Sequence, residues 1–153
     1  MKPIGENPVE KHKAEKDGLN ILDEIEVLAS NNGGWETIDP GDRERLKWIG
    51  TFFRKPTPGQ FMMRIRITGG QATSAQLRVL ADIARRVGNE VLDLTTRQQI
   101  ELRAVRIRDV PSIMSALDGV DLTSLQTGMD SIRNVISCPL AGLTSAELFD
   151  AAP

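Results

Sequence analysis

Every second residue from Phe61 to Ile67 is apolar, and this alternation constrains the fold more than any other feature of the chain. A period of two is typical of a β-strand that turns one face toward a core and the other away from it. The same period returns further along the chain, where Ile100, Leu102 and Ala104 share one face. Two half-buried strands need other elements to cover their apolar faces, so we expect helices to pack against them.

Helix signals lie before these strands and between them. The apolar spacing predicts helices over residues 20–30, 40–47, 74–87 and 111–118, strands over 61–68 and 91–105, and a strand-like piece over 122–126. Asp39 is expected to cap the helix that begins at Pro40. The side chains of the third helix that are expected to face inward are Leu77, Leu80, Ala81, Ala84 and Val87. This order of elements predicts an α+β fold with helices on one face of a sheet.

The composition limits the partners and sites that the chain can have. Its formal net charge of −2 gives no general attraction to nucleic acid or to an anionic membrane. One cysteine and one histidine exclude an internal disulfide and a metal site made from several such residues, and we interpret Cys138 as a small buried side chain. No apolar stretch approaches the roughly 18 residues of a membrane-spanning helix. Residues 1–18 are polar, unlike a secretory signal, and are expected to form a mobile or loosely docked arm of a cytoplasmic protein.

Arginines occupy the polar faces of both central strands. If the strands share a sheet, four guanidinium groups point to one surface, and such clustering costs free energy unless an anion compensates for it. This pattern predicts a ligand with several acidic groups. The alternative is a solvated sheet face on which Glu101 and Asp93 are the local partners, and the spacing does not decide between the two. The four arginines are Arg64, Arg66, Arg97 and Arg103.

Three motifs resemble those of the siroheme-dependent nitrite and sulfite reductases, and they occur in the same order. The motifs are residues 61–66 followed by Gly69-Gly70, residues 94–98, and residues 129–135. Further likeness over residues 15–19 and 45–50 is to the ferredoxin-dependent nitrite reductases of cyanobacteria and plants. The resemblance covers nearly the whole chain, from about residue 13 to residue 151.

This resemblance implies a fold, an activity and two cofactors. It implies an arm over residues 1–18, a ferredoxin-like half-domain over 19–127, with helices on one face of an antiparallel sheet, and the start of a siroheme-binding lobe over 128–153. The implied activity is the six-electron reduction of nitrite to ammonia at siroheme coupled to a [4Fe–4S] cluster, with reduced ferredoxin as donor. Cluster ligands are expected downstream, so no metal ligand is expected in this chain, which alone should be inactive. The alternatives are a sulfite reductase and a stand-alone anion-binding module without redox activity.

The resemblance also implies roles for individual side chains. Arg64 and Arg133 match arginines that bind the substrate anion. Glu101 departs from the family, in which glutamine is usual at this position, and a carboxylate facing an acidic macrocycle is repelled unless it is paired, for example with Arg103. Gln98 matches a motif residue and is assigned a structural role. The residues implied to contact siroheme are Arg66, Thr96, Arg97, Glu101, Arg103 and Asn134.

Overall fold

The computed structural model describes residues 7–31, 34–129 and 131–149, and it confirms the α+β fold class. Residues 1–6 of the expected arm, Asn32 and Gly33 at an expected helix end, Asp130 of the third motif and residues 150–153 lie outside this description. The helices are α1 (Pro8–Glu15), α2 (Ile21–Ser30), α3 (Pro40–Arg45), α4 (Ser74–Val87) and α5 (Val110–Asp118). The strands are β1 (Thr51–Phe53), β2 (Phe61–Ile65), β3 (Leu92–Leu94) and β4 (Ile100–Val105).

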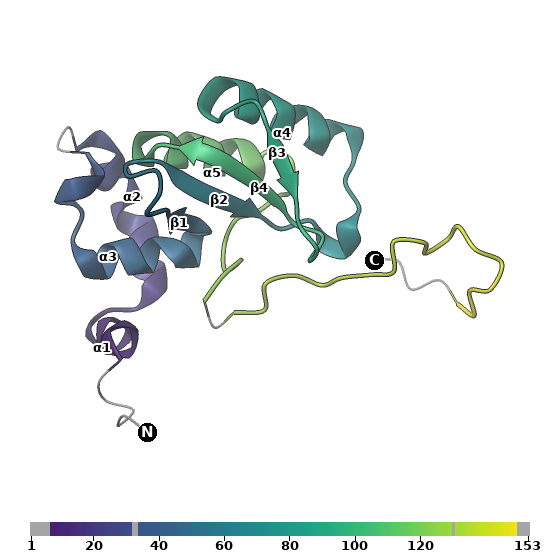
Figure 1. Ribbon diagram of the computed structural model, residues 1–153, viewed down its shortest axis with the longest axis horizontal. Coiled ribbons are helices and arrows are strands. Elements are labelled where there is room, and N and C mark those ends of the chain that lie inside the picture. The colour runs from purple at the N-terminus through teal and green to yellow at the C-terminus, as the bar shows by residue number, and fades with distance from the viewer. Residues whose placement is uncertain (1–6, 32–33, 130, 150–153) are drawn as a thin grey trace.

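The four strands form one antiparallel sheet in the order β1-β2-β4-β3. The inward face of β2 is as expected, because Phe61, Met63 and Ile65 are completely buried, but Met62 on the other face is also buried, with 8% exposed. Figure 1 shows α4 and α5 together on one side of the sheet, and their apolar stripes join α2 and the strands in a single core. The opposite side of the sheet is therefore left for polar side chains.

The alternation along β4 holds only as far as Leu102. Ala104, which was expected to share the buried face, adopts a left-handed conformation with φ of 60°, and Val105 is the buried residue instead. The pairing of β2 with β4 shifts at this point, since Phe61 pairs with Val105 and Met63 with Leu102. One additional residue in β4 forms a bulge that restores a buried residue opposite Phe61.

Helix α4 begins and packs largely as expected. Thr73 and Gln76 form a capping box, and the core stripe consists of Leu80, Ile83 and Ala84. Leu77, which was expected to face inward, is 47% exposed because it lies beyond this stripe at the rim of a cavity. The predicted cap of Asp39 on α3 is confirmed by its bond to the Gly41 amide.

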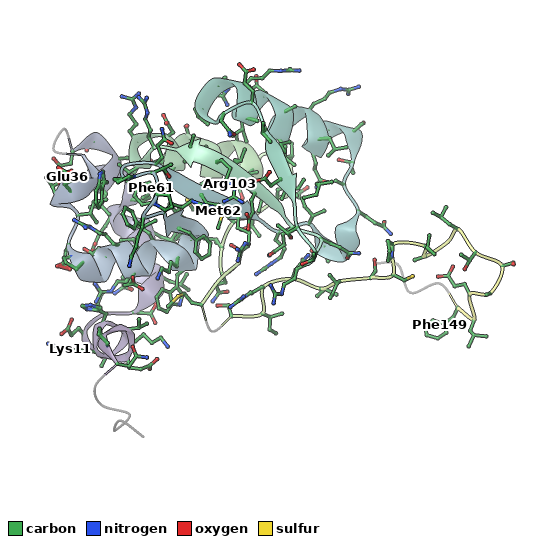
Figure 2. All side chains as sticks on the ribbon, in the orientation of Figure 1. Lys11, Glu36, Phe61, Met62, Arg103 and Phe149 are labelled. Carbon is green, nitrogen blue, oxygen red and sulfur yellow. The ribbon has the colours of Figure 1, made fainter. Side chains whose placement is uncertain are left out.

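The expected strand over 122–126 is wrong as an extended element. In its place the structure has a single bridge between Arg66 and Thr123. Beyond α5, the described part of the chain forms no further helix or strand and runs past the sheet as an irregular segment (Figure 1). Figure 2 shows Phe149 far from the sheet at the end of this segment.

The arm is not loosely docked from residue 8 onward. Helix α1 packs beside α3, where the buried Arg45 donates Nη2 to the His12 carbonyl at 2.8 Å and Nη1 to Asp42 at 2.8 Å. The backbone of Gly18 packs directly against the Trp48 ring, and a Cβ at this glycine would come within 2.2 Å of the ring. The described part of the arm is therefore docked on α3 and on Trp48.

Lys16 joins the arm to two helices through Glu24 of α2 and Asp42 of α3. Partial burial lowers the pKa of Lys16, but the hydrogen bonds and charges of the two carboxylates outweigh it and raise the pKa above its ordinary value of 10.5. A group whose pKa rises on folding stabilises the fold below its ordinary pKa and loses this contribution as the pH rises above it.

Replacing Lys16 with methionine is expected to lower the melting temperature at pH 8 by about 2 °C. The difference in melting temperature between the variant and the unmodified chain should disappear as the pH rises from 10.5 through the raised pKa of Lys16. Thermal unfolding followed by circular dichroism measures it. Lys11→Met, on the exposed side of α1, is the matched control and should change little. A Lys16 effect that persists at high pH would contradict the ion-pair explanation.

Candidate anion-binding site

Strand register places alternating charges in one row across the sheet. Arg64 of β2 lies opposite Glu101 of β4, and Glu101 lies opposite Asp93 of β3. Arg64 donates Nε and Nη2 to Glu101 Oε1, at 3.0 and 2.9 Å. Arg103, labelled over the strands in Figure 2, donates to Asp93 at 2.6 Å and to Glu101 Oε2 at 2.9 Å. Two cations and two anions therefore form a continuous network.

This network corrects part of the sequence interpretation. Arg64 and Arg103 do not accumulate uncompensated charge, because Glu101 and Asp93 neutralise both guanidinium groups. Arg64 is fixed further by a bond from Nη1 to the Thr127 carbonyl at 3.2 Å and by the ring of Phe52, whose centroid lies 4.8 Å from the guanidinium carbon. For these two arginines the alternative with local carboxylate partners describes the structure.

Arg66 binds main-chain carbonyls rather than side chains. Its Nη2 donates to Leu125, Gln126 and Ile132 at 3.0–3.1 Å, and its Nε donates to Arg133 at 3.2 Å. These acceptors lie about 60 residues further along the chain. Arg66 was assigned to siroheme, but its guanidinium is engaged in holding the irregular segment against β2.

Two amide side chains complete the attachment of this segment. Gln99, 2% exposed, donates Nε2 to the Arg133 carbonyl at 2.6 Å. Asn134 donates Nδ2 to the carbonyls of Arg97, Ile67 and Gln98, at 2.8, 3.0 and 3.2 Å. The backbones of Arg97 and Arg133 are therefore fixed relative to each other.

Gln98 has the structural role assigned to it from the sequence. Its side-chain amide exchanges two hydrogen bonds with the backbone of Ser137, at 2.7 and 2.9 Å.

Arg97 and Arg133 differ from the sheet arginines, because neither guanidinium forms an ion pair with a described residue. Both are exposed, and both line a cavity of about 390 Å³ together with Ser131, Asn134 and Ile136. Arg97 belongs to the turn between β3 and β4, in which Thr96 is also exposed. Two positive charges therefore face one cavity without a counterion among the described residues.

The chemistry of this cavity fits an acidic ligand. Guanidinium groups bind carboxylates through paired, charge-assisted hydrogen bonds, and siroheme is a polycarboxylate. Asn134 also lines the cavity, but its Nδ2 donates to backbone carbonyls and its Oδ1 can only accept, so its side chain offers an ionised carboxylate no free donor. Arg97 and Arg133 are therefore the described residues that suit such a group.

A larger cavity, of about 510 Å³, lies next to the 69–70 glycine turn and is more apolar. Cys138, which was interpreted as buried, is an exposed thiol at its edge, because the segment that carries it leaves the core. No helix in the described parts of the chain is long and apolar enough to cross a membrane.

Sequence reasoning missed the contributions of Gln99, Phe52 and Thr127. Strand alternation assigned Gln99 to the solvent face, whereas its amide is buried against Arg133. No local signal identifies such a residue, since its partner lies 34 residues away.

Comparison with known proteins assigns part of this chain to a protein family. A family model described as the nitrite/sulfite reductase ferredoxin-like half domain matches residues 53–120, which span β1 to α5. Residues 53–120 form a nitrite/sulfite reductase ferredoxin-like half domain. The half domain thus includes the charged network on the sheet and Arg97, and the segment with Arg133 follows it. The family resemblance inferred from the three motifs is confirmed.

Relatives extend this likeness over almost the whole chain. It is 51% identical to the ferredoxin–nitrite reductase of Synechococcus elongatus and 40% identical to the chloroplastic enzyme of Spinacia oleracea, over 94% and 97% of its length. The structure of the Mycobacterium tuberculosis NirA protein matches 94% of the chain with a TM-score of 0.85 and 28% sequence identity. The chain spans only 26–29% of the length of these proteins.

Proposed function

We propose that this chain is the N-terminal part of an assimilatory ferredoxin–nitrite reductase, which reduces nitrite to ammonia with six electrons. The observation that carries this proposal is the pair of unneutralised guanidinium groups, Arg97 and Arg133, at one cavity beside a nitrite/sulfite reductase half domain. Residues 128–153 are proposed as the start of the siroheme lobe.

Each residue has a proposed task. Arg97 binds siroheme carboxylates, with Asn134 and the exposed Thr96 at its side, while Arg133 and Arg64 face the substrate anion. Arg66 and Gln99 hold the Arg133 carbonyl, and so fix the backbone from which this side chain extends. Siroheme supplies the iron at which the electrons are transferred, and the cluster that delivers them has its ligands outside this chain. The arginines contribute a fixed positive field at the bound oxygens.

Nitrite is preferred to sulfite as the proposed substrate. The family description covers both anions, but the relatives from Synechococcus, spinach and Haloferax mediterranei are all named nitrite reductases. Ferredoxin as donor follows from the same names. A cytoplasmic location stays a prediction, since the spinach relative is named chloroplastic.

A chimera tests the proposal. This chain replaces the matching 28% of the Synechococcus elongatus reductase, to which it is 51% identical. The purified chimera is expected to show siroheme absorbance and to reduce nitrite with reduced ferredoxin, whereas the chain alone should reduce none. A folded chimera without siroheme would favour a stand-alone anion-binding module, and faster turnover of sulfite than of nitrite would favour a sulfite reductase.

A further inference from the structure

Glu101 is the carboxylate that stands closest to the proposed substrate arginine. Both its oxygens are occupied: Oε1 accepts two bonds from Arg64, and Oε2 accepts one from Arg103. Its side chain is only 10% exposed, so water screens its charge weakly. It is therefore a permanent feature of the site rather than a surface group that can turn away.

The donors that Arg64 still offers to a ligand lie next to this negative charge. One bond from Nη1 goes to Thr127, and Nε and Nη2 each give one bond to Glu101. A guanidinium group has five N–H bonds, so two are left for a ligand. An anion bound there is attracted by Arg64 and repelled by Glu101, which contacts the same guanidinium group.

Glu101 offsets the preference of Arg64 for highly charged anions. The energy between two charges is proportional to their product, so a doubly charged anion is attracted by Arg64 about twice as strongly as a singly charged one and is repelled by Glu101 about twice as strongly. Arg103 is bound to both Asp93 and Glu101, so the network of two cations and two anions has no net positive charge to attract a dianion. We propose that Glu101 is a specificity-determining residue that weakens the binding of doubly charged anions, such as the sulfite dianion, more than that of singly charged ones, such as nitrite, at Arg64. This inference rests on the proposed role of Arg64 in the reductase.

The test uses this chain labelled with ¹⁵N at arginine, with sodium nitrite and sodium sulfate as probes. Sulfate is a stable dianion that replaces sulfite, and ionic strength is held constant. The Arg64 Nε–H signal, assigned by its loss in Arg64→Gln, reports binding. In the unmodified chain sulfate should bind no more than about tenfold more tightly than nitrite, and a larger preference for sulfate would overturn the proposal.

Glu101→Gln removes the charge and keeps an oxygen that can accept from Arg64. It is expected to raise nitrite affinity about tenfold and sulfate affinity about a hundredfold, because the dianion gains twice the energy. An equal gain for both anions, or no gain, would overturn the proposal. If the variant does not fold, as judged by circular dichroism, the ratio of sulfate affinity to nitrite affinity in the unmodified chain tests the proposal.

Asp93→Asn is the matched control, because it removes one negative charge from the same network without touching Arg64. We expect it to change either affinity by less than about threefold. An effect equal to that of Glu101→Gln would show that only net charge matters and would overturn the specific role. The two proposals can fail separately. If Glu101→Gln changes neither affinity while the chimera still contains siroheme, the role of Glu101 is excluded and the proposed function stands.

Discussion

Replacing Arg97 with alanine in the chimera is expected to weaken siroheme binding by about thirtyfold or more. Arg97 forms no ion pair with a described residue, so the structure gives its guanidinium no partner that a ligand would have to displace. Its loss removes paired bonds to a carboxylate and leaves the fold intact, since the side chain is exposed. The visible absorbance of siroheme per mole of purified protein measures this loss.

Three companion variants make this result specific. Arg133→Ala should reduce the absorbance less, because Arg133 shares the cavity with Arg97 but is proposed to face the substrate anion. Arg97→Lys keeps the charge but not the paired donors, and partial recovery is expected. Arg85→Ala, at an exposed position of α4, is the control and should retain full absorbance. Full siroheme content in both Arg97→Ala and Arg133→Ala would exclude the cavity as the cofactor site.

Replacing Gly50 with alanine is expected to lower the free energy of unfolding by about 3 kcal/mol or more. Gly50 has a φ of 77°, and a Cβ there would lie 2.3 Å from the Ser124 carbonyl oxygen and 2.9 Å from that of Arg64. Both neighbours are backbone atoms, so they cannot rotate away. The Gly50 carbonyl also accepts the Arg64 amide at 2.9 Å, so the strain reaches the charged network.

Urea unfolding of the chain measures this loss of stability. Gly142→Ala is the control, because Gly142 also has a positive φ, 72°, but no atom within 4 Å of an added Cβ. It should cost at most about 1 kcal/mol. If the two variants lose equal stability, the close approach of Ser124 and Arg64 to Gly50 is not what requires glycine there.

Local patterns in the sequence predicted the elements that carry local signals. The apolar spacing located β2 and α4, and the Asp39–Pro40 pair located the start of α3. The bulge at Ala104 was missed because alanine gives no indication of a left-handed conformation. A single residue of this kind reverses the face on which the rest of the strand lies.

The site was only partly predictable for a related reason. Alternation correctly put Arg64 and Arg66 on one face of β2, but it could not show what each guanidinium would bind. Arg64 donates to a carboxylate 37 residues away, and Arg66 donates to main-chain carbonyls of the irregular segment. Partners at such separations are set by how the segments pack in three dimensions, which a periodic pattern does not record.

The irregular stretch around Arg133 differs in local stability from the sheet beside it. Side chains from the sheet and turn, chiefly Arg66, Gln98 and Gln99, secure this stretch, and its described residues contribute no strand to the sheet. Segments held in this way open with a smaller free energy than global unfolding requires. Amide hydrogen exchange is therefore expected to be faster in this stretch than in β2 and β4.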